Sequence, residues 1–596
     1  MIKKKLIIIV ILLFFLTIRG VHTPIYAADK HLMTKLANTT YASGRIIVKT
    51  KSKVDSKVFS TGSFLPVNDR KLVSKVVPLI KVVSNKDVVG LNRVFVVFTT
   101  VGKEKMLVDS LNKNKKIEYA ELDYLAKETT ITPIIPNDPF YKKDLNNNPL
   151  WYRGYLLMES AWGVNSGDSN TVIAIIDSGI DYSHPDLTAK IWTNPGEIAN
   201  NNIDDDNNGY IDDVHGWNVN QNNNNTNDEF GHGTIVSGIA AATSNNNLGM
   251  TGLAWKNSIL PVRANVGSSG IFNYSDIAKA IVYADSFPTV KVINLSMGGY
   301  ANSALLRDTI KNVLNNNKAV IVAGIGNDNI DIFNTPFYPA AYRGVIAVGA
   351  HANGLARVYS YGYPIQISAP GKDIYTTFLG GDYGYCSGTS CAAPFVSGVV
   401  ALMASHFPDW TGKELNQGIK IWTDNPPDSS DYCYQPPMPS CLPGQACIQV
   451  MPDSVCERVD WTPQYGFGTL NGIMPLLAKC YDSSQELRTT IEIKSPDDRA
   501  SFTRSQVVNI VGTVKSDNFI NYKIEYGKGA SPSAWISEGV ALTGNGTQVV
   551  ENGVLAQWNL SKITDSGYYQ YRVRIYGKSS CNGNITGDER ALIYIN

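Results

Sequence analysis

Short apolar runs that alternate with amphipathic segments constrain the middle of this chain more than any other feature. The runs are rich in β-branched residues, and several are separated by helical stretches such as 275–286 and 304–317. They are TVIAIID (171–177), SILPVRA (258–264), KVINLS (291–296), AVIVAG (319–324) and GVIAVGA (344–350). This alternation predicts an α/β fold in which helices cover both faces of a mostly parallel sheet. Because such sheets bind ligands at the carboxyl ends of their strands, we expect chemistry at the residues that end these runs.

The segments on either side of this region differ from it. Residues 40–127 contain strand patterns at 44–51, 93–100 and 117–125 and a helical pattern at 104–116, so a small α+β domain is expected. Residues 486–596 contain alternating segments between Gly, Asn and Asp turns, which predict an all-β, immunoglobulin-like sandwich. We therefore expect four parts, namely 1–27 (signal peptide), 28–135 (leader domain), 136–482 (α/β domain) and 483–596 (β-sandwich).

The start of the chain is typical of an export signal. Lys3, Lys4 and Lys5 precede the apolar run 6–18, and small residues follow at Ala27 and Ala28. The alternative is an uncleaved anchor, but the run is too short to span a bilayer comfortably and no later segment approaches that length. We expect cleavage after Ala27 or Ala28 and a secreted, extracellular protein, free or associated with the cell surface.

Composition excludes several classes of protein. Lysine plus arginine number 53 and aspartate plus glutamate 52, so a net charge of +1 argues against bulk electrostatic binding to nucleic acid or anionic membrane. Hydrophobic residues are 43% and charged residues 18%, which argues against a disordered chain and against a multi-span membrane protein. With 7 histidines, few candidates for a histidine base need to be compared.

Four residues have the chemistry and local context of a nucleophilic site. Asp177 ends the first run in IIDSGID, His232 opens a helical run in FGHGTIVSGIAAA, and Ser390 precedes a helix in CSGTSCAAPFVSGVVALM. A serine hydroxyl needs a base, histidine can serve near neutral pH, and a buried carboxylate holds the imidazole in the required tautomer. Asn327, after the run in VAGIGND, offers an amide to an oxyanion, beside the Ser390 N–H. Taken singly, each has an ordinary structural explanation as a turn or helix-cap residue.

Taken together and in this order, the blocks resemble the subtilase family of serine proteases over about residues 136–475. Further similar runs are HPDL (184–187), INLSMGG (293–299), YPAAY (338–342), ISAPG (367–371) and YGFGTLNG (465–472). The resemblance implies a peptide-bond hydrolase acting through an acyl-enzyme, with a triad and an oxyanion donor at Asp177, His232, Ser390 and Asn327. It also implies that Ser296, Met297 and Gly298 form an edge that pairs with extended polypeptide substrates.

The chain departs from the family pattern at two positions near these blocks. Cys391 follows Ser390 where the family often has Met, and Cys386 stands five residues before it. The two thiols form a bond across the nucleophile's turn, or Cys391 is simply a small buried apolar residue; we favour the second explanation. Ile325 stands where smaller residues are commoner in the family, and we expect it to narrow the primary specificity pocket.

The remaining cysteines predict disulfides in an oxidising compartment. Cys433, Cys441, Cys447 and Cys456 lie in a Pro-rich stretch with no CxxC pair and no histidine, so two disulfides of unknown pairing are favoured over zinc. A bond between Cys480 and Cys581 would join the last two domains.

Two calcium sites are expected. DDDNNGYIDD (204–213) has the spacing of an EF-hand-type loop, with candidate ligands Asp204, Asp206, Asn208, Asp212 and the carbonyl of Tyr210. The alternative for this segment is a solvated acidic loop. The family resemblance implies a second site, formed by Asp138, Asp186 and Asn246 with the carbonyls of Leu248 and Met250.

The leader domain resembles the propeptide of secreted subtilases. The resemblance implies that it assists folding, then inhibits the enzyme, and is removed by self-cleavage within 126–137. The alternative is a permanent accessory domain. We expect a monomeric zymogen whose partners are polypeptide substrates and its own propeptide. Two rival functions are an inactive homologue that serves as a binding protein, and an adhesion protein in which the β-sandwich is the main functional unit.

Overall fold

The computed structural model describes residues 41–52, 70–78, 93–124, 132–141, 150–421, 423, 462–467, 469–472, 488–577 and 585–596. The chain divides into two compact units, 1–129 and 130–596, and each is considered by itself. The expected signal peptide and the cysteines at 433, 441, 447, 456, 480 and 581 lie outside the described residues.

The first unit is a small α+β domain, as the sequence predicts. A four-stranded antiparallel sheet has the order β2-β3-β1-β4, and one helix joins β3 to β4. Ile46 and Val48, which alternate along one strand, are buried against Leu107 and Leu111 of the helix. The elements are β1 (Tyr41–Thr50), β2 (Val73–Pro78), β3 (Val94–Thr99), α4 (Glu104–Asn112) and β4 (Ile117–Tyr124).

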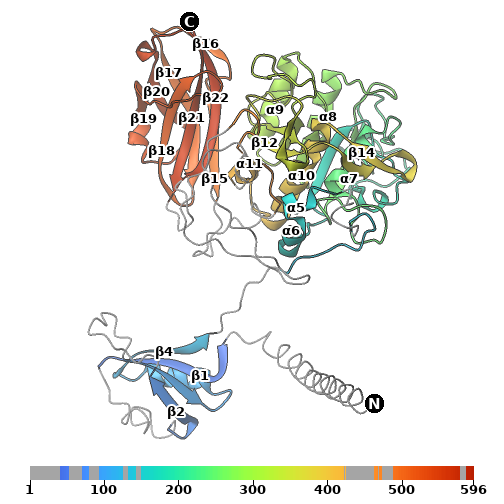
Figure 1. The fold of residues 1–596 in the computed structure, drawn as a ribbon. Helices are drawn as coiled ribbons and strands as arrows, with labels where there is room; N and C mark the ends of the chain where they lie inside the picture. Colours follow the sequence, from blue (N-terminus) through green and yellow to red (C-terminus); the bar gives the residue numbers. More distant parts are fainter. Residues whose placement is uncertain are drawn as a thin grey trace, which may run out of the picture. The chain divides into compact units, whose positions relative to one another are not determined.

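The second unit contains the expected sheet, with the order β11-β10-β9-β8-β5-β7-β6 and with β12 paired to β10. Its strands belong to the teal to yellow-green part of the ribbon in Figure 1. All of its pairings are parallel except β10 with β11. The strands are β5 (Val172–Asp177), β6 (Trp217–Asn218), β7 (Ser258–Arg263), β8 (Val290–Leu295), β9 (Val320–Gly324), β10 (Ile346–His351), β11 (Arg357–Val358) and β12 (Ile367–Pro370).

Helices cover both faces of this sheet, which explains why its strands are apolar throughout. Along β5, Ile173 and Ile175 enter one core with residues of α7 and α10, whereas Val172 and Ile176 enter the other with residues of α8 and α9. The helices are α5 (Arg153–Leu156), α6 (Met158–Val164), α7 (His232–Ala241), α8 (Tyr274–Ser286), α9 (Ala304–Asn316), α10 (Thr389–His406) and α11 (Gly412–Ile421).

Helix α10 is long and apolar. Among the described residues it alone has the length and hydropathy to cross a bilayer, but 83% of it is buried within the fold. Its apolar character therefore reflects its central place in the core. A short hairpin of β13 (Ile374–Thr377) and β14 (Tyr383–Cys386) leads into it.

The C-terminal residues form the predicted β-sandwich, with sheets of order β15-β17-β20-β19 and β16-β22-β21-β18. Large side chains such as Trp558 and Tyr571 fill the space between the sheets. The strands are β15 (Thr489–Ser495), β16 (Ala500–Phe502), β17 (Val507–Ser516), β18 (Phe519–Lys528), β19 (Val540–Leu542), β20 (Val550–Asn559), β21 (Gly567–Gly577) and β22 (Ile585–Ile595).

The sandwich is joined to the α/β domain by buried polar contacts. Lys420 of α11 lies 2.6 Å from the Glu589 carboxylate of β22, and Gln417 donates to the same oxygen at 3.0 Å. Arg343 donates to the carbonyl of Pro496 at 2.8 Å, and the Tyr363 hydroxyl donates to Asp498 at 3.1 Å. Because the Lys420 and Glu589 side chains are almost fully buried, separating the two domains would expose a charge pair and its surroundings to water.

Candidate active site

The two candidates for a carboxylate–imidazole pair meet where β5 ends and α7 begins. Asp177 is the last residue of β5 and is fully buried, and His232 is the first residue of α7. The Nδ1 atom of His232 lies 2.8 Å and 3.0 Å from the two Asp177 carboxylate oxygens. The helix reaches this position because residue 233 is glycine, since a Cβ there would lie 2.1 Å from the Gly179 carbonyl oxygen.

The electrostatic surroundings of His232 favour its protonated form. Burial by itself would lower the imidazole pKa, but the Asp177 carboxylate opposes this, and Asp228 adds a second negative charge. The net result is a pKa above the ordinary value of 6.5. A raised pKa makes the imidazole a stronger base than a free histidine.

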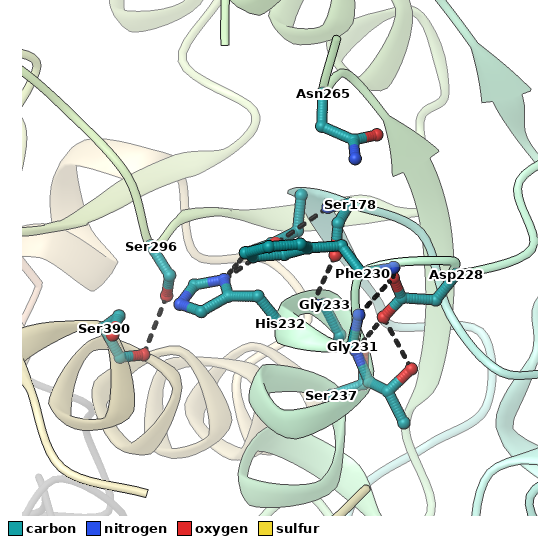
Figure 2. Close-up of polar contacts among 12 residues, drawn as sticks. Ser178, Asp228, Phe230, Gly231, His232, Gly233, Ser237, Asn265, Ser296 and Ser390 are labelled. Atoms are coloured by element: carbon teal, nitrogen blue, oxygen red, sulfur yellow. Dashed lines mark hydrogen bonds and ion pairs between the residues drawn. The ribbon is translucent and has the colours of Figure 1, made fainter. Parts of the chain in front are cut away.

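Asp228 is a site residue that the sequence reasoning missed. Its carboxylate accepts hydrogen bonds from the backbone N–H groups of Phe230, Gly231 and Thr234 and from the Thr234 hydroxyl. It thus caps the first turn of the helix that carries His232 (Figure 2). The sequence does carry a signal for this capping role, because Asp228 stands four residues before the histidine that opens the helix.

Ser390 lies in the first turn of α10, where the helix dipole is positive. Its carbonyl accepts a hydrogen bond from the Ser296 hydroxyl at 2.9 Å, and Figure 2 shows His232 turned toward this pair. Among the described residues no hydrogen bond joins His232 to Ser390. In many enzymes the hydrogen bond between the base and the nucleophile forms fully only when substrate binds.

Asn327 follows the end of β9 and is held by the residue before Ser390. Its Oδ1 atom accepts hydrogen bonds from the Thr389 backbone N–H at 2.8 Å and from the Thr389 hydroxyl at 3.0 Å. Because Oδ1 accepts both bonds, the other amide atom, Nδ2, faces the space beside Gly388. A Cβ placed on Gly388 would lie 3.1 Å from both Asn327 Nδ2 and Ser390 Oγ, so the missing side chain leaves space between the amide and the hydroxyl.

The expected substrate edge begins where β8 ends. The Ser296 hydroxyl accepts a hydrogen bond from Asn294 at 3.0 Å, and Asn294 in turn accepts one from Ser397 of α10 at 2.8 Å. The buried Asn294 therefore ties the edge to the helix that carries Ser390. Met297 is partly buried, whereas Ile325 is fully buried in the core, with its Cδ1 directed toward Gly349.

The preference for an unbonded Cys391 was wrong. Cys391 is fully buried, as expected, but the structure joins it to Cys386 in a disulfide. The bond closes a short ring of chain from the end of β14 to the first turn of α10, and this ring contains Ser390.

The acidic loop brings together a partly different set of carboxylates from the one that the spacing predicts. Oxygens of Glu197, Asp206 and Asp213 lie within 4.8 Å of one another, and Asn208 donates to both aspartates. Burial and neighbouring carboxylates raise the pKa of both Glu197 and Asp213. Of the predicted ligands, Asp204 and Asp212 instead accept bonds from backbone N–H groups of the loop, and Tyr210 packs on Trp217 and Tyr283.

The structure also brings together the residues of the second predicted calcium site. Asp138 and Asp186 are fully buried beside the loop 245–251. The Asp138 carboxylate accepts from the backbone N–H of Asn246 at 2.9 Å, and Asp186 accepts from the Asn246 side chain at 2.8 Å and from the Met250 N–H at 2.9 Å. Leu248 lies in the same loop, and its N–H donates to Asn246.

These contacts define a class of enzyme. A carboxylate-bound imidazole, a serine at a helix N-terminus and a fixed side-chain amide are the groups that acyl transfer by a serine nucleophile requires. Their chain order, aspartate, histidine, serine, is that of the subtilisins.

Comparison with known proteins agrees with this class. The model of the Subtilase family matches residues 168–428. The chain is 37% identical over 335 residues to "Thermophilic serine proteinase" of Bacillus sp. (strain AK1), covering 56% of this chain and 74% of that protein. It is 35% identical over 277 residues to "Thermitase" of Thermoactinomyces vulgaris (45% and 85%) and 31% identical over 322 residues to "Subtilisin NAT" of Bacillus subtilis subsp. natto (53% and 73%). The chain belongs to the subtilase family and is a subtilisin-like serine endopeptidase.

Replacement of Thr389 by valine should lower kcat by about tenfold, because the Asn327 amide loses one of the two donors that orient it. KM should change little, since the hydroxyl of the buried Thr389 contacts Asn327 and the Gly326 N–H rather than the substrate edge. Thr389→Ser keeps the hydroxyl and should restore kcat. Steady-state kinetics on a peptide substrate measures both constants, and equal activity of the valine and serine variants would contradict this role.

The acid limb of the pH profile of kcat/KM should have its midpoint above pH 6.5, because protonated His232 cannot accept the serine proton and its pKa is raised. Asp228→Asn removes one nearby negative charge and should move the midpoint to lower pH while leaving the plateau at high pH. A wild-type midpoint at or below 6.5, measured at constant ionic strength, would contradict the raised pKa.

Proposed function

We propose that this protease is secreted as a zymogen and stabilised by calcium, and that it cleaves polypeptides through an acyl-enzyme formed on Ser390. The single observation that supports the mechanism most strongly is the pair of fixed groups beside Ser390. These are the imidazole bound to the buried Asp177 and the Asn327 amide oriented by Thr389.

The first half of the reaction is acylation. When substrate binds, His232 Nε2 removes the Ser390 hydroxyl proton as Oγ attacks the carbonyl carbon, and Asp177 stabilises the resulting imidazolium. Asn327 Nδ2 and the Ser390 N–H donate to the oxyanion. The imidazolium then gives its proton to the departing amine, and the peptide C–N bond breaks.

The second half repeats these steps with water. His232 removes a proton from a water molecule that attacks the ester carbonyl carbon, and the same donors stabilise the second oxyanion. Collapse of this intermediate breaks the ester bond and returns the proton to Ser390 Oγ. The substrate backbone is held along Ser296, Met297 and Gly298 as an added strand.

The first unit acts in this proposal as a propeptide. It folds around its own core and precedes the protease domain, which is consistent with a removable inhibitor. Self-cleavage is expected within 126–137, a segment that lies only partly within the described residues. Export and removal of the signal peptide rest on the pattern of the first residues.

Calcium fits the acidic loop on two observations. Three carboxylates converge there, and the Glu197 Oε2 atom is buried without a hydrogen-bond partner. Oxygen ligands of this kind are those that Ca²⁺ prefers. Glu197, Asp206 and Asp213 would hold the ion with Asn208, and Asp138, Asp186 and Asn246 the second ion with the Leu248 and Met250 carbonyls. Bound calcium would neutralise these charges and fix the loops.

Ser390→Ala should abolish both self-cleavage and casein hydrolysis when the chain is expressed without its first 27 residues. Asn327→Leu should retain slow activity, with kcat lowered about 10²- to 10³-fold. Gel electrophoresis follows processing, and casein hydrolysis follows turnover. A wild-type chain that is folded but neither self-cleaves nor digests casein with calcium present would support the inactive-homologue alternative.

Removal of calcium with a chelator should lower the melting temperature, since an ion at 100 times its Kd contributes about 2.7 kcal/mol to the free energy of unfolding. Glu197→Gln should reduce this chelator-dependent shift, because one ligand oxygen of the loop site loses its charge. Glu551→Gln, on the exposed surface of the sandwich, is the matched control. Melting curves of the Ser390→Ala forms avoid autolysis, and identical shifts in all three proteins would exclude the loop site.

A further inference from the structure

The disulfide that encloses Ser390 connects two elements across a short turn. Cys386 is the last residue of β14, where it is paired with Ile374 of β13. Cys391 lies in the first turn of α10. The residues between the two cysteines, and therefore inside the ring that the bond closes, are Ser387, Gly388, Thr389 and Ser390.

Residues inside this ring set the direction of both oxyanion donors. Thr389 holds the Oδ1 atom of Asn327 through its backbone N–H at 2.8 Å and its hydroxyl at 3.0 Å. The next residue in the ring supplies the Ser390 N–H. Because such donors stabilise an oxyanion only when they are aimed at the position that it occupies, the rate is sensitive to small displacements of this turn.

Hydrogen bonds alone constrain the turn less than the covalent bond does. The Gly388 N–H donates to the Gly371 carbonyl at 2.8 Å. The exposed Ser387 accepts a bond on its hydroxyl from the Asp373 N–H at 2.9 Å. Glycine loses more backbone freedom on ordering than any other residue, so Gly388 makes the turn costly to fix. The disulfide reduces this cost because it already holds the two ends of the turn together.

The two sulphur atoms have different surroundings. Cys391 is fully buried in the core, whereas Cys386 is only partly buried and follows the exposed Tyr385. After reduction the sulphurs are no longer at bonding distance and must separate to van der Waals contact. Cys391 has little space in which to move, because the core around it is closely packed. The displacement therefore falls on Cys386 and on the turn that leads from it to Ser390.

We propose that the Cys386–Cys391 disulfide is a positioning element of the active site and a thiol-sensitive switch, so that the protease is fully active only when the bond is formed. The inference rests on the proposed function, because it takes Ser390 as nucleophile and Asn327 as oxyanion donor. Since disulfides persist in oxidising compartments and are rare in reducing ones, a chain that has not yet been exported would have an incomplete site. This control would act in addition to the propeptide.

The switching reaction is thiol–disulfide exchange with an external dithiol. A thiolate of the dithiol attacks Sγ of Cys386, the more accessible sulphur, so that a mixed disulfide forms and the Cys391 thiolate leaves. The second thiolate of the reagent then attacks the reagent's own sulphur in the mixed disulfide and releases the Cys386 thiolate. The enzyme gains two electrons and two protons, and the dithiol is oxidised to a cyclic disulfide. An external disulfide reverses these steps.

The test measures kcat and KM of the mature wild-type enzyme on a peptide p-nitroanilide over a series of dithiothreitol concentrations, with calcium present. Reduction of this bond should lower kcat by about 10- to 100-fold and change KM by less than about twofold. Oxidised glutathione should restore kcat. Alkylation with iodoacetamide and mass spectrometry report the state of Cys386 and Cys391 in each sample.

Two further readouts separate positioning from a general loss of structure. Exhaustive labelling with a fluorophosphonate counts the competent Ser390, so that kcat is expressed per active site. The midpoint of the acid limb of the pH profile should not move on reduction, because the bond between His232 and Asp177 joins residues outside the ring. Melting curves confirm that the reduced enzyme is folded at the assay temperature.

The matched variant combines Cys386→Ser with Cys391→Ser, which removes this bond and keeps every other cysteine of the chain. Its kcat should equal that of the reduced wild-type enzyme and should not respond to dithiothreitol. A response that persists in this variant would come from other cysteines and would overturn the assignment. Reduction of the wild-type enzyme needs no substitution, so it decides the question if the variant folds poorly.

The inference alone would be refuted by an unchanged kcat in wild-type enzyme whose Cys386 and Cys391 are both alkylated. A double variant as active as the oxidised wild type, or a bond that dithiothreitol reduces only when the protein melts, would refute it equally. Absence of both fluorophosphonate labelling and casein hydrolysis in the oxidised wild type would instead refute the proposed function itself.

Discussion

The buried carboxylate of Asp177 is the constraint on which the site depends. An ionised carboxylate without water needs donors on its oxygens, and here the His232 ring and the Ser178 N–H provide them. The donors are available because β5 is an inner strand of the sheet and the first turn of α7 approaches its end closely, at Gly233. Asp228 fixes that helix start from the other side. The same arrangement that satisfies a buried charge therefore sets the tautomer of the imidazole.

A second set of contacts places the nucleophile relative to this pair. Thr389 binds the Asn327 amide, Ser296 binds the Ser390 carbonyl, and Asn294 connects Ser296 to α10. The bonds of Thr389 and Ser390 join the ends of two strands to the amino end of α10, and Asn294 is bound further along the same helix by Ser397. Because parallel strands end at the same edge of a sheet, one helix can contact all of these groups.

Residues whose role follows from local pattern were predictable from the sequence, and those that depend on packing were not. The strand runs and the Asp177, His232, Ser390 and Asn327 blocks carry recognisable spacing, and the structure brings them to one edge. Glu197 lies outside the segment 204–213, and the EF-hand-type spacing selects Asp212 rather than Asp213, so folding of the loop decides which carboxylates meet. The Cys386–Cys391 bond did not follow from the sequence, because cysteine spacing alone does not distinguish a bonded from a merely buried thiol.

The disulfide around the nucleophile has a consequence for the lifetime of the enzyme. Tyr385 and Ser387, beside and within this ring, are exposed. A cut at any peptide bond between Cys386 and Cys391 would leave the two fragments covalently joined, so that the helix carrying Ser390 stays attached to the hairpin that precedes it. The segment that contains the nucleophile therefore stays attached at both ends after a single cut within it.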